Sequence, residues 1–63
     1  MNKAKREKYV EAIMWCFVCN GYFERFEDIP HRNIYRAFKD LKRFMYLFDS
    51  VEQTLNTLYP RVK

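Results

Sequence analysis

The sequence predicts an all-α fold, a small domain of three antiparallel helices packed around an aromatic-rich core. Apolar residues recur every three or four positions over much of the chain, which is the spacing that forms one face of a helix. Of the 63 residues, 49% are hydrophobic and 19% are aromatic, which supplies the core. The length suits a single helical domain, residues 1–63, and domains this small bury only about 60% of their unfolded surface. We therefore expect a bound partner or a second copy of the chain, as in a homodimer, to add stability.

The first helix is predicted over residues 4–19. It begins in a charged lead-in that holds four cations, and it continues through Tyr9–Cys19, where every residue except Glu11 is apolar or aromatic. A helix that is apolar on all sides lies between two neighbours or across an interface between copies.

A β-hairpin is the alternative for residues 12–27. Asn20-Gly21 separates two aromatic-rich runs, Met14–Cys19 and Tyr22–Glu27, and Asn-Gly in such a position is a strong hairpin signal. However, Met14–Cys19 does not alternate between apolar and polar residues, and Gly21 suits the left-handed conformation that ends many helices. The helix is the preferred interpretation.

Residues 22–30 are predicted to connect the first helix to the second. Glu24, Glu27 and Asp28 precede the second helix, where its dipole favours negative charge. We expect Asp28 to cap that helix and Pro30 to lie in its first turn. Three apolar residues are expected to pin the connector to the core as a short helix of their own, namely Phe23, Phe26 and Ile29.

The second helix, predicted over residues 31–47, has the clearest two-sided pattern in the chain. One side is apolar and is expected to face the core. Its positions are Ile34, Ala37, Phe38, Leu41, Phe44, Met45 and Phe48. The other side is cationic, and two tyrosines and a lysine border it. These positions are Arg32, Arg36, Lys39 and Arg43, with Tyr35, Lys42 and Tyr46 along one shoulder.

A third, short helix is predicted over residues 51–59. Ser50 followed by Gln53 three residues later forms a capping box, which is a typical helix start. Pro60 ends the segment because proline cannot continue a helix. The apolar face of this helix comprises Val51, Leu55, Leu58 and Tyr59.

The net charge of +4 is concentrated in two segments. Residues 31–48 hold five cations and one acid, and residues 1–11 hold four cations and two acids. A solvated helix face, with Asp40 paired to Arg36 and Arg43, is the plainest interpretation of the cationic stripe. Because one acid cannot neutralise the stripe, the functional interpretation is an anionic partner, either the phosphate backbone of nucleic acid or an acidic protein surface.

No catalytic, cofactor or metal site is predicted. The chain has one serine, one histidine and one glycine, so it lacks the parts of a phosphate-binding loop. Cys16 and Cys19 lie at the carboxyl end of the first helix, where the dipole does not activate a thiol. We expect both to be small buried hydrophobic residues. The alternatives are a redox pair or a zinc site completed by His31 and by Glu27 or Asp28.

The expected location is the cytoplasm. Two cysteines in so short a chain do not make a disulfide scaffold, which favours a reducing compartment. No membrane span is expected, because the apolar run Ala12–Cys19 is far shorter than the ~20 residues that a span needs. The same run lacks the cleavage site of a signal peptide.

Residues 30–41 read PHRNIYRAFKDL. This run resembles the recognition-helix segment of winged helix-turn-helix regulators, which often carry a Val/Ile-Tyr-Arg-Ala-Leu-x-x-Leu pattern. The resemblance implies a DNA-binding helix whose first polar residues enter the major groove. The chain departs from that family, since it has little room for a full helix between Gly21 and Pro30 and no wing hairpin after Phe48. The family is therefore not assigned.

The residues predict a non-enzymatic, small basic protein that binds nucleic acid or a nucleoprotein in a regulatory or accessory role. Cations would contact phosphates, and tyrosine rings would stack on exposed bases. The predicted binding residues are Arg32, Arg36, Lys39, Lys42, Arg43, Tyr35 and Tyr46. The alternative is a small adaptor or inhibitor that docks on a larger protein through exposed aromatic residues such as Trp15, Tyr22 and Phe23.

Overall fold

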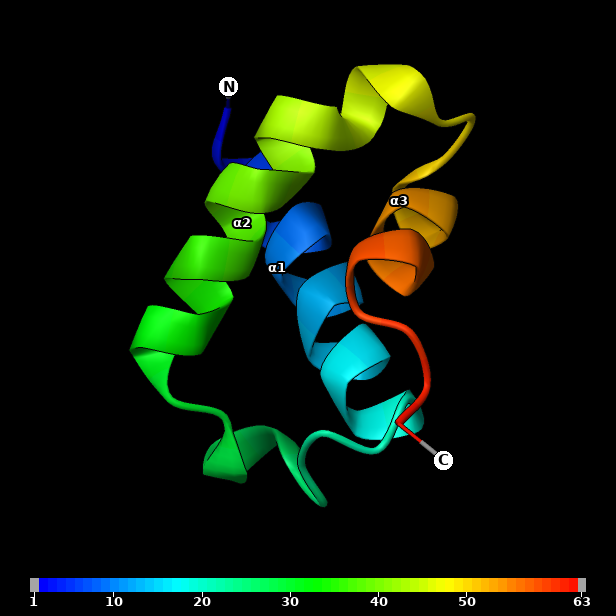
Figure 1. Ribbon diagram of the computed structural model, residues 1–63. Coiled ribbons are helices and arrows are strands. Elements are labelled where there is room, and N and C mark those ends of the chain that lie inside the picture. The colour runs from blue at the N-terminus through cyan, green and yellow to red at the C-terminus, as the bar shows by residue number, and fades with distance from the viewer. Residues whose placement is uncertain (1, 63) are drawn as a thin grey trace.

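Three helices and two 3₁₀ turns form the fold, in the order α1 (Lys3–Cys19), η1 (Phe26–Asp28), α2 (His31–Phe44), η2 (Met45–Leu47) and α3 (Val51–Leu58). The computed structural model describes residues 2–62. Helices α1 and α2 run antiparallel, as Figure 1 shows, and α3 packs against both of them. The predicted all-α, three-helix fold is confirmed, with the end of the second helix tightened into η2.

The core lies where the three helices meet. Ile13 of α1, Leu41 of α2 and Leu55 of α3 are almost completely buried there. Phe17 closes one end of the core, because its ring packs edge-on against those of Tyr22, Phe23 and Tyr59, with centroids 5.1–5.7 Å apart. The aromatic-rich core that the composition predicted is therefore present, and edge-to-face packing orders it.

Helix α1 ends at Cys19, and a Schellman motif at Gly21 closes it. Gly21 has φ +89°, its N–H donates to the Val18 carbonyl over 3.2 Å, and the Tyr22 N–H donates to the Phe17 carbonyl over 2.9 Å. These two bonds satisfy carbonyls that the last helical turn leaves open, and the Tyr22–Phe17 ring contact accompanies them. The hairpin alternative around Asn20-Gly21 is therefore wrong, and the helix-ending role of Gly21 is confirmed.

Asn20 connects the end of α1 to the end of α3. Its buried side-chain amide donates to the Asn56 Oδ1 atom and to the Tyr59 carbonyl, each over 2.8 Å. Its own carbonyl accepts from the Val62 N–H over 3.0 Å. The C-terminal residues therefore return to the carboxyl end of α1 (Figure 1), a contact that the sequence pattern did not predict.

The helix starts agree with prediction in one case and differ in another. The Ser50 Oγ atom accepts from the Gln53 N–H over 3.0 Å, which confirms the predicted start of α3. The prediction that Asp28 caps α2 is wrong, because Pro30 occupies the cap position without a side-chain hydrogen bond. Asp28 instead forms an ion pair with Arg25, at 3.8 Å. Here the η1 turn, which was predicted as a short helix, ends before α2 begins and turns Asp28 back toward its own segment.

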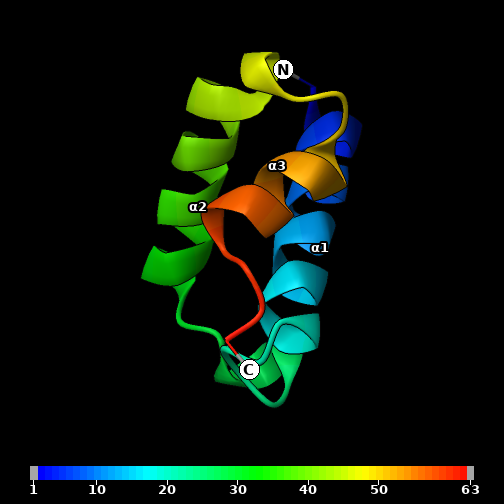
Figure 2. The ribbon, with the colours of Figure 1, turned by 45° about the vertical axis from the view of Figure 1, so that its right-hand side comes forward.

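Helix α3 covers only one face of the α1–α2 pair, as Figure 2 shows. Among residues 2–62 no fourth α-helix and no strand of any kind is formed. A wing hairpin is therefore absent from the described chain. None of the three helices combines the length and the apolar character needed to cross a membrane.

Candidate interface on helix α2

The predicted cationic residues lie on the solvent side of α2. All five are exposed, whereas Ala37 and Leu41 on the other side of the helix have no accessible surface. The residues in question are Arg32, Arg36, Lys39, Lys42 and Arg43. Helical spacing places four of them on one stripe, and we call Arg32, Arg36, Lys39 and Arg43 the basic face.

The two predicted tyrosines are strongly exposed beside the basic face. Tyr35 is 66% exposed and Tyr46 is 81% exposed. Tyr46 belongs to η2 rather than to α2, so it extends the aromatic border beyond the end of the helix. Leu47 is exposed next to it, which the sequence pattern did not indicate.

Asp40, the only acid of α2, does not form the predicted ion pairs with Arg36 and Arg43. Its Oδ2 atom accepts a hydrogen bond from the Tyr59 hydroxyl over 2.9 Å. Burial, together with this bond to a carboxylate, raises the pKa of Tyr59 to about 12. Among residues 2–62 the only ion pair within 4.0 Å is Arg25–Asp28, so the basic face keeps its charge toward solvent.

Aromatic rings, not carboxylates, hold several of these cations. The Lys39 Nζ atom lies 5.4 Å from the Tyr35 ring centroid, and the Arg43 guanidinium lies 5.2 Å from the Phe44 ring centroid. Contacts of this kind restrain a cation without neutralising it. The charge therefore stays available to an anionic ligand.

A small polar notch lies at the amino-terminal end of the basic face. It has a volume of about 250 Å³ and is lined by Arg32, Asn33 and Arg36. Because no side chain caps this end of α2, the helix dipole adds to the attraction that the two guanidinium groups exert on an anion. The residue types and the position suit a phosphate group.

Lys42 lies apart from the basic face. Together with His31 it lines a groove between α1 and α2, and its Nζ atom lies 5.8 Å from the Phe38 ring centroid. Of the seven predicted binding residues, four lie on the basic face by helical spacing, and Tyr35 lies beside Lys39 while it also lines the groove. Lys42 faces a different surface.

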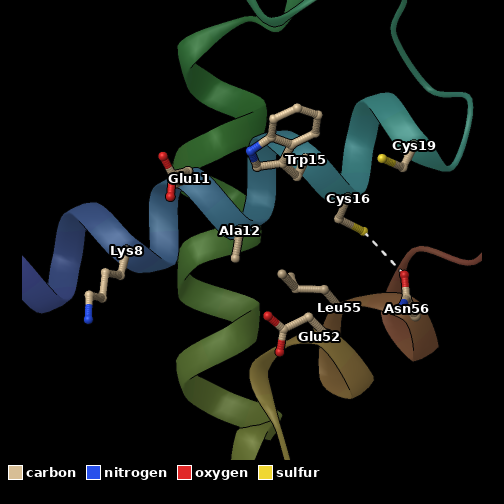
Figure 3. A pocket seen from close by; sticks show the side chains of 9 residues that line it. All are labelled: Lys8, Glu11, Ala12, Trp15, Cys16, Cys19, Glu52, Leu55 and Asn56. Atoms are coloured by element: carbon tan, nitrogen blue, oxygen red, sulfur yellow. Dashed lines mark hydrogen bonds between the residues drawn. The ribbon is translucent and has the colours of Figure 1, made fainter.

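The cysteines do not form a metal site in the described part of the chain. Cys16 lies against α3, where its Sγ atom is 3.9 Å from the Asn56 Oδ1 atom (Figure 3), and burial raises the pKa of its thiol. Cys16 is half-buried and Cys19 is exposed, so the expectation that both cysteines are buried is wrong. Residues 2–62 bring together no group of three or more His, Cys, Asp and Glu side chains that can hold a metal ion.

The aromatic residues named for the adaptor alternative differ in how much of their side chains is exposed. Trp15 is 53% exposed and packs edge-on against Phe26, with centroids 4.8 Å apart. Tyr22 and Phe23 are half-buried against Phe17, so the prediction that they are exposed is wrong. They stabilise the end of α1 instead, because the Schellman turn folds the chain back over the helix.

Comparison of the chain with protein-family models, curated proteins and solved structures finds no match.

Proposed function

We propose that this protein is a non-enzymatic, nucleic-acid-binding protein with a regulatory or accessory role, acting in the cytoplasm. The observation that supports this proposal is the unpaired positive charge of the basic face. Four cations lie exposed on one side of α2, while the single acid of that helix is engaged by Tyr59. A helix face with this surplus of charge attracts a polyanion.

The binding mode follows from the arrangement of the side chains. The basic face runs along α2 and is suited to contact successive phosphates, beginning with the notch between Arg32 and Arg36. Tyr35 and Tyr46 flank it with exposed rings on which bases stack in single-stranded regions. Phosphate contacts of this type give affinity without base preference.

Salt dependence is the direct test. If the four cations of the basic face neutralise about four phosphates, the logarithm of the affinity for a fluorescein-labelled single-stranded oligonucleotide should fall against log salt with a slope of about −3. The triple variant R36E/K39E/R43E should abolish binding in a fluorescence anisotropy titration. Binding that is independent of salt, or that survives this triple reversal, contradicts the proposal.

A matched control separates the basic face from net charge. The variant K5E/K8E/R61E changes the charge by the same amount at three exposed positions off α2. It should retain most of the affinity, because a long-range charge effect is screened beyond about 8 Å at physiological salt. Equal loss of binding in both triple variants would show that only the total charge matters.

A further inference from the structure

An open groove lies between α1 and α2. It has a volume of about 730 Å³, the largest hollow described in the molecule. Val10 and Met14 of α1 and Ile34 and Phe38 of α2 line it with apolar side chains that are only half-buried. Met14, Ile34 and Phe38 pack in part against the core, and Phe26 of η1 lies near Met14. Helix α3 lies over the other face of this helix pair, so the side of these residues that faces the groove stays open.

The groove accounts for the all-round apolar character of α1. Tyr9, Ile13 and Phe17 are buried on the side that faces the core, whereas Val10 and Met14 belong to the open side. A helix that is apolar on all sides normally has neighbours on more than one side. The open side of α1 therefore lacks a neighbour that its sequence is suited to contact.

The charges at the rim define what that neighbour must be. Arg6 of α1 and Lys42 of α2 are the charged side chains among the lining residues, and no carboxylate lines the groove itself. Glu7 and Glu11 line the adjoining hollow on the outer side of α1. The rim is therefore cationic on both helices, while the floor is apolar. An amphipathic helix that lays its apolar side into such a groove must carry acidic residues beside that side.

We propose that the α1–α2 groove binds an acidic amphipathic helix of a partner protein, as a site separate from the basic face. A second copy of the chain does not fit this requirement. In a twofold pair the same surface meets itself, so Arg6 and Lys42 of one copy would face those of the other. None of the chain's own helices is acidic enough to serve instead, since α1 and α2 are net basic and α3 carries Glu52 as its only charged residue.

The probe for this site is a panel of fluorescein-labelled, helix-forming peptides of about 18 residues, with leucines at helical spacing and glutamates beside them. Two controls accompany each peptide, one with lysine in place of glutamate and one with the same residues scrambled. Affinity is measured by anisotropy, and the site is located by methyl NMR. Met14 and Ile34 line the groove, whereas Met45 and Ile13 do not, so they serve as internal references.

We expect the acidic amphipathic peptides to bind the protein, and to shift the methyl signals of Met14 and Ile34 but not those of Met45 and Ile13. The variant R6E/K42E should weaken this binding by at least about tenfold, because the rim then repels the peptide. The variant K5E/R61E, with the same change in net charge at exposed positions outside the groove, should weaken it less than about threefold. Far-UV circular dichroism checks that each variant is folded.

The basic-face variant R36E/K39E/R43E distinguishes this proposal from the proposed function. It should abolish oligonucleotide binding but leave binding of the acidic peptide unchanged. The groove proposal is overturned if no peptide of the panel binds at about 1 mM, or if lysine or scrambled peptides bind as well as acidic ones. Equal losses in R6E/K42E and K5E/R61E also overturn it. So does an oligonucleotide that shifts Met14 and Ile34, or a dimer in sedimentation equilibrium that buries those residues without peptide.

Discussion

Two polar regions of this protein differ in what their side chains contact. At the carboxyl end of α1, Asn20 donates to Asn56 and to the Tyr59 carbonyl over 2.8 Å, and the C-terminal residues fold over it. On the outer side of α2, the basic face has aromatic neighbours but no carboxylate within ion-pair distance in the described chain. The first region, which we call the Asn20 junction, uses polar groups to stabilise the fold. The second leaves its charges for a ligand.

This contrast gives opposite expectations for stability and for binding. A domain of 63 residues is stabilised by roughly 3–9 kcal/mol, at about 0.05–0.15 kcal/mol per residue. One buried polar contact is therefore a large share of the total, whereas exposed charges contribute little. Substitutions at the Asn20 junction should lower the free energy of unfolding, and substitutions on the basic face should not.

The substitution Asn20→Leu should have the largest effect. It removes the amide donor of the Asn56 Oδ1 atom and of the Tyr59 carbonyl, which keep only weak contacts with the Cys16 thiol at 3.8–3.9 Å. The cost is about 1–3 kcal/mol for an acceptor that stays buried, and a buried leucine in place of the amide adds the mismatch with these polar neighbours. We expect the melting temperature to fall by more than about 10 °C, measured by circular dichroism. Asn33→Ala is the control, because the Asn33 side chain makes no hydrogen bond to a described protein atom, and it should shift the melting temperature far less. A small shift for Asn20→Leu would break the contrast.

Tyr59→Phe should cost about 2 kcal/mol, because a hydrogen bond to a charged acceptor is lost. The pKa of Tyr59 is raised to about 12 in the folded protein, from about 10 in the unfolded chain. The bond's contribution is therefore complete below pH about 10. It is lost as the pH rises toward 12, because the unfolded chain releases the proton first. Urea titrations at several pH values should show a constant difference between wild type and Tyr59→Phe below pH 10, which then shrinks. A difference that grows with pH contradicts this account.

Gly21→Ala should cost about 1–2 kcal/mol. Gly21 has φ +89°, a conformation that disfavours any L side chain, and a Cβ atom there would lie 3.0 Å from the Val62 Cγ2 atom. Val62 is 52% exposed near the end of the chain, so its side chain has room to shift and backbone conformation should dominate. The double variant Gly21→Ala with Val62→Ala should therefore recover only a small part of the lost stability, as measured by thermal denaturation. Complete recovery would assign the cost to the contact instead.

The sequence predicted the basic face better than the Asn20 junction for a physical reason. Helical spacing alone places Arg36, Lys39 and Arg43 on one side, so a pattern within a single segment is sufficient. The bonds from Asn20 to Asn56 and Tyr59 join residues 36 and 39 positions apart, and no local pattern specifies them. Local spacing also suggested that Asp40 pairs with its own helix, whereas a tertiary contact from Tyr59 engages it.

The α1–α2 groove escaped sequence reasoning for a similar reason. The apolar character of α1 indicated more than one neighbour, but not which side remains open. That side is fixed by the position of α3, which depends on the turn at η2 and on the Asn20 junction. Likewise, Tyr22 and Phe23 are half-buried because the Schellman turn directs them onto Phe17, which composition does not reveal.

The smallest effect on stability is expected for R36E/K39E/R43E, the variant with the largest expected effect on oligonucleotide binding. Its three side chains are exposed and form no ion pair in the described chain, so the free energy of unfolding should change by less than about 0.5 kcal/mol. A slight loss is expected at low salt, because the three new glutamates repel one another and Asp40 along α2. Urea denaturation at low and at high salt measures the change in the free energy of unfolding and its dependence on salt. A loss of about 2 kcal/mol or more would mean that these cations have partners within the fold, and the contrast between the two polar regions would then fail together with the proposed interface.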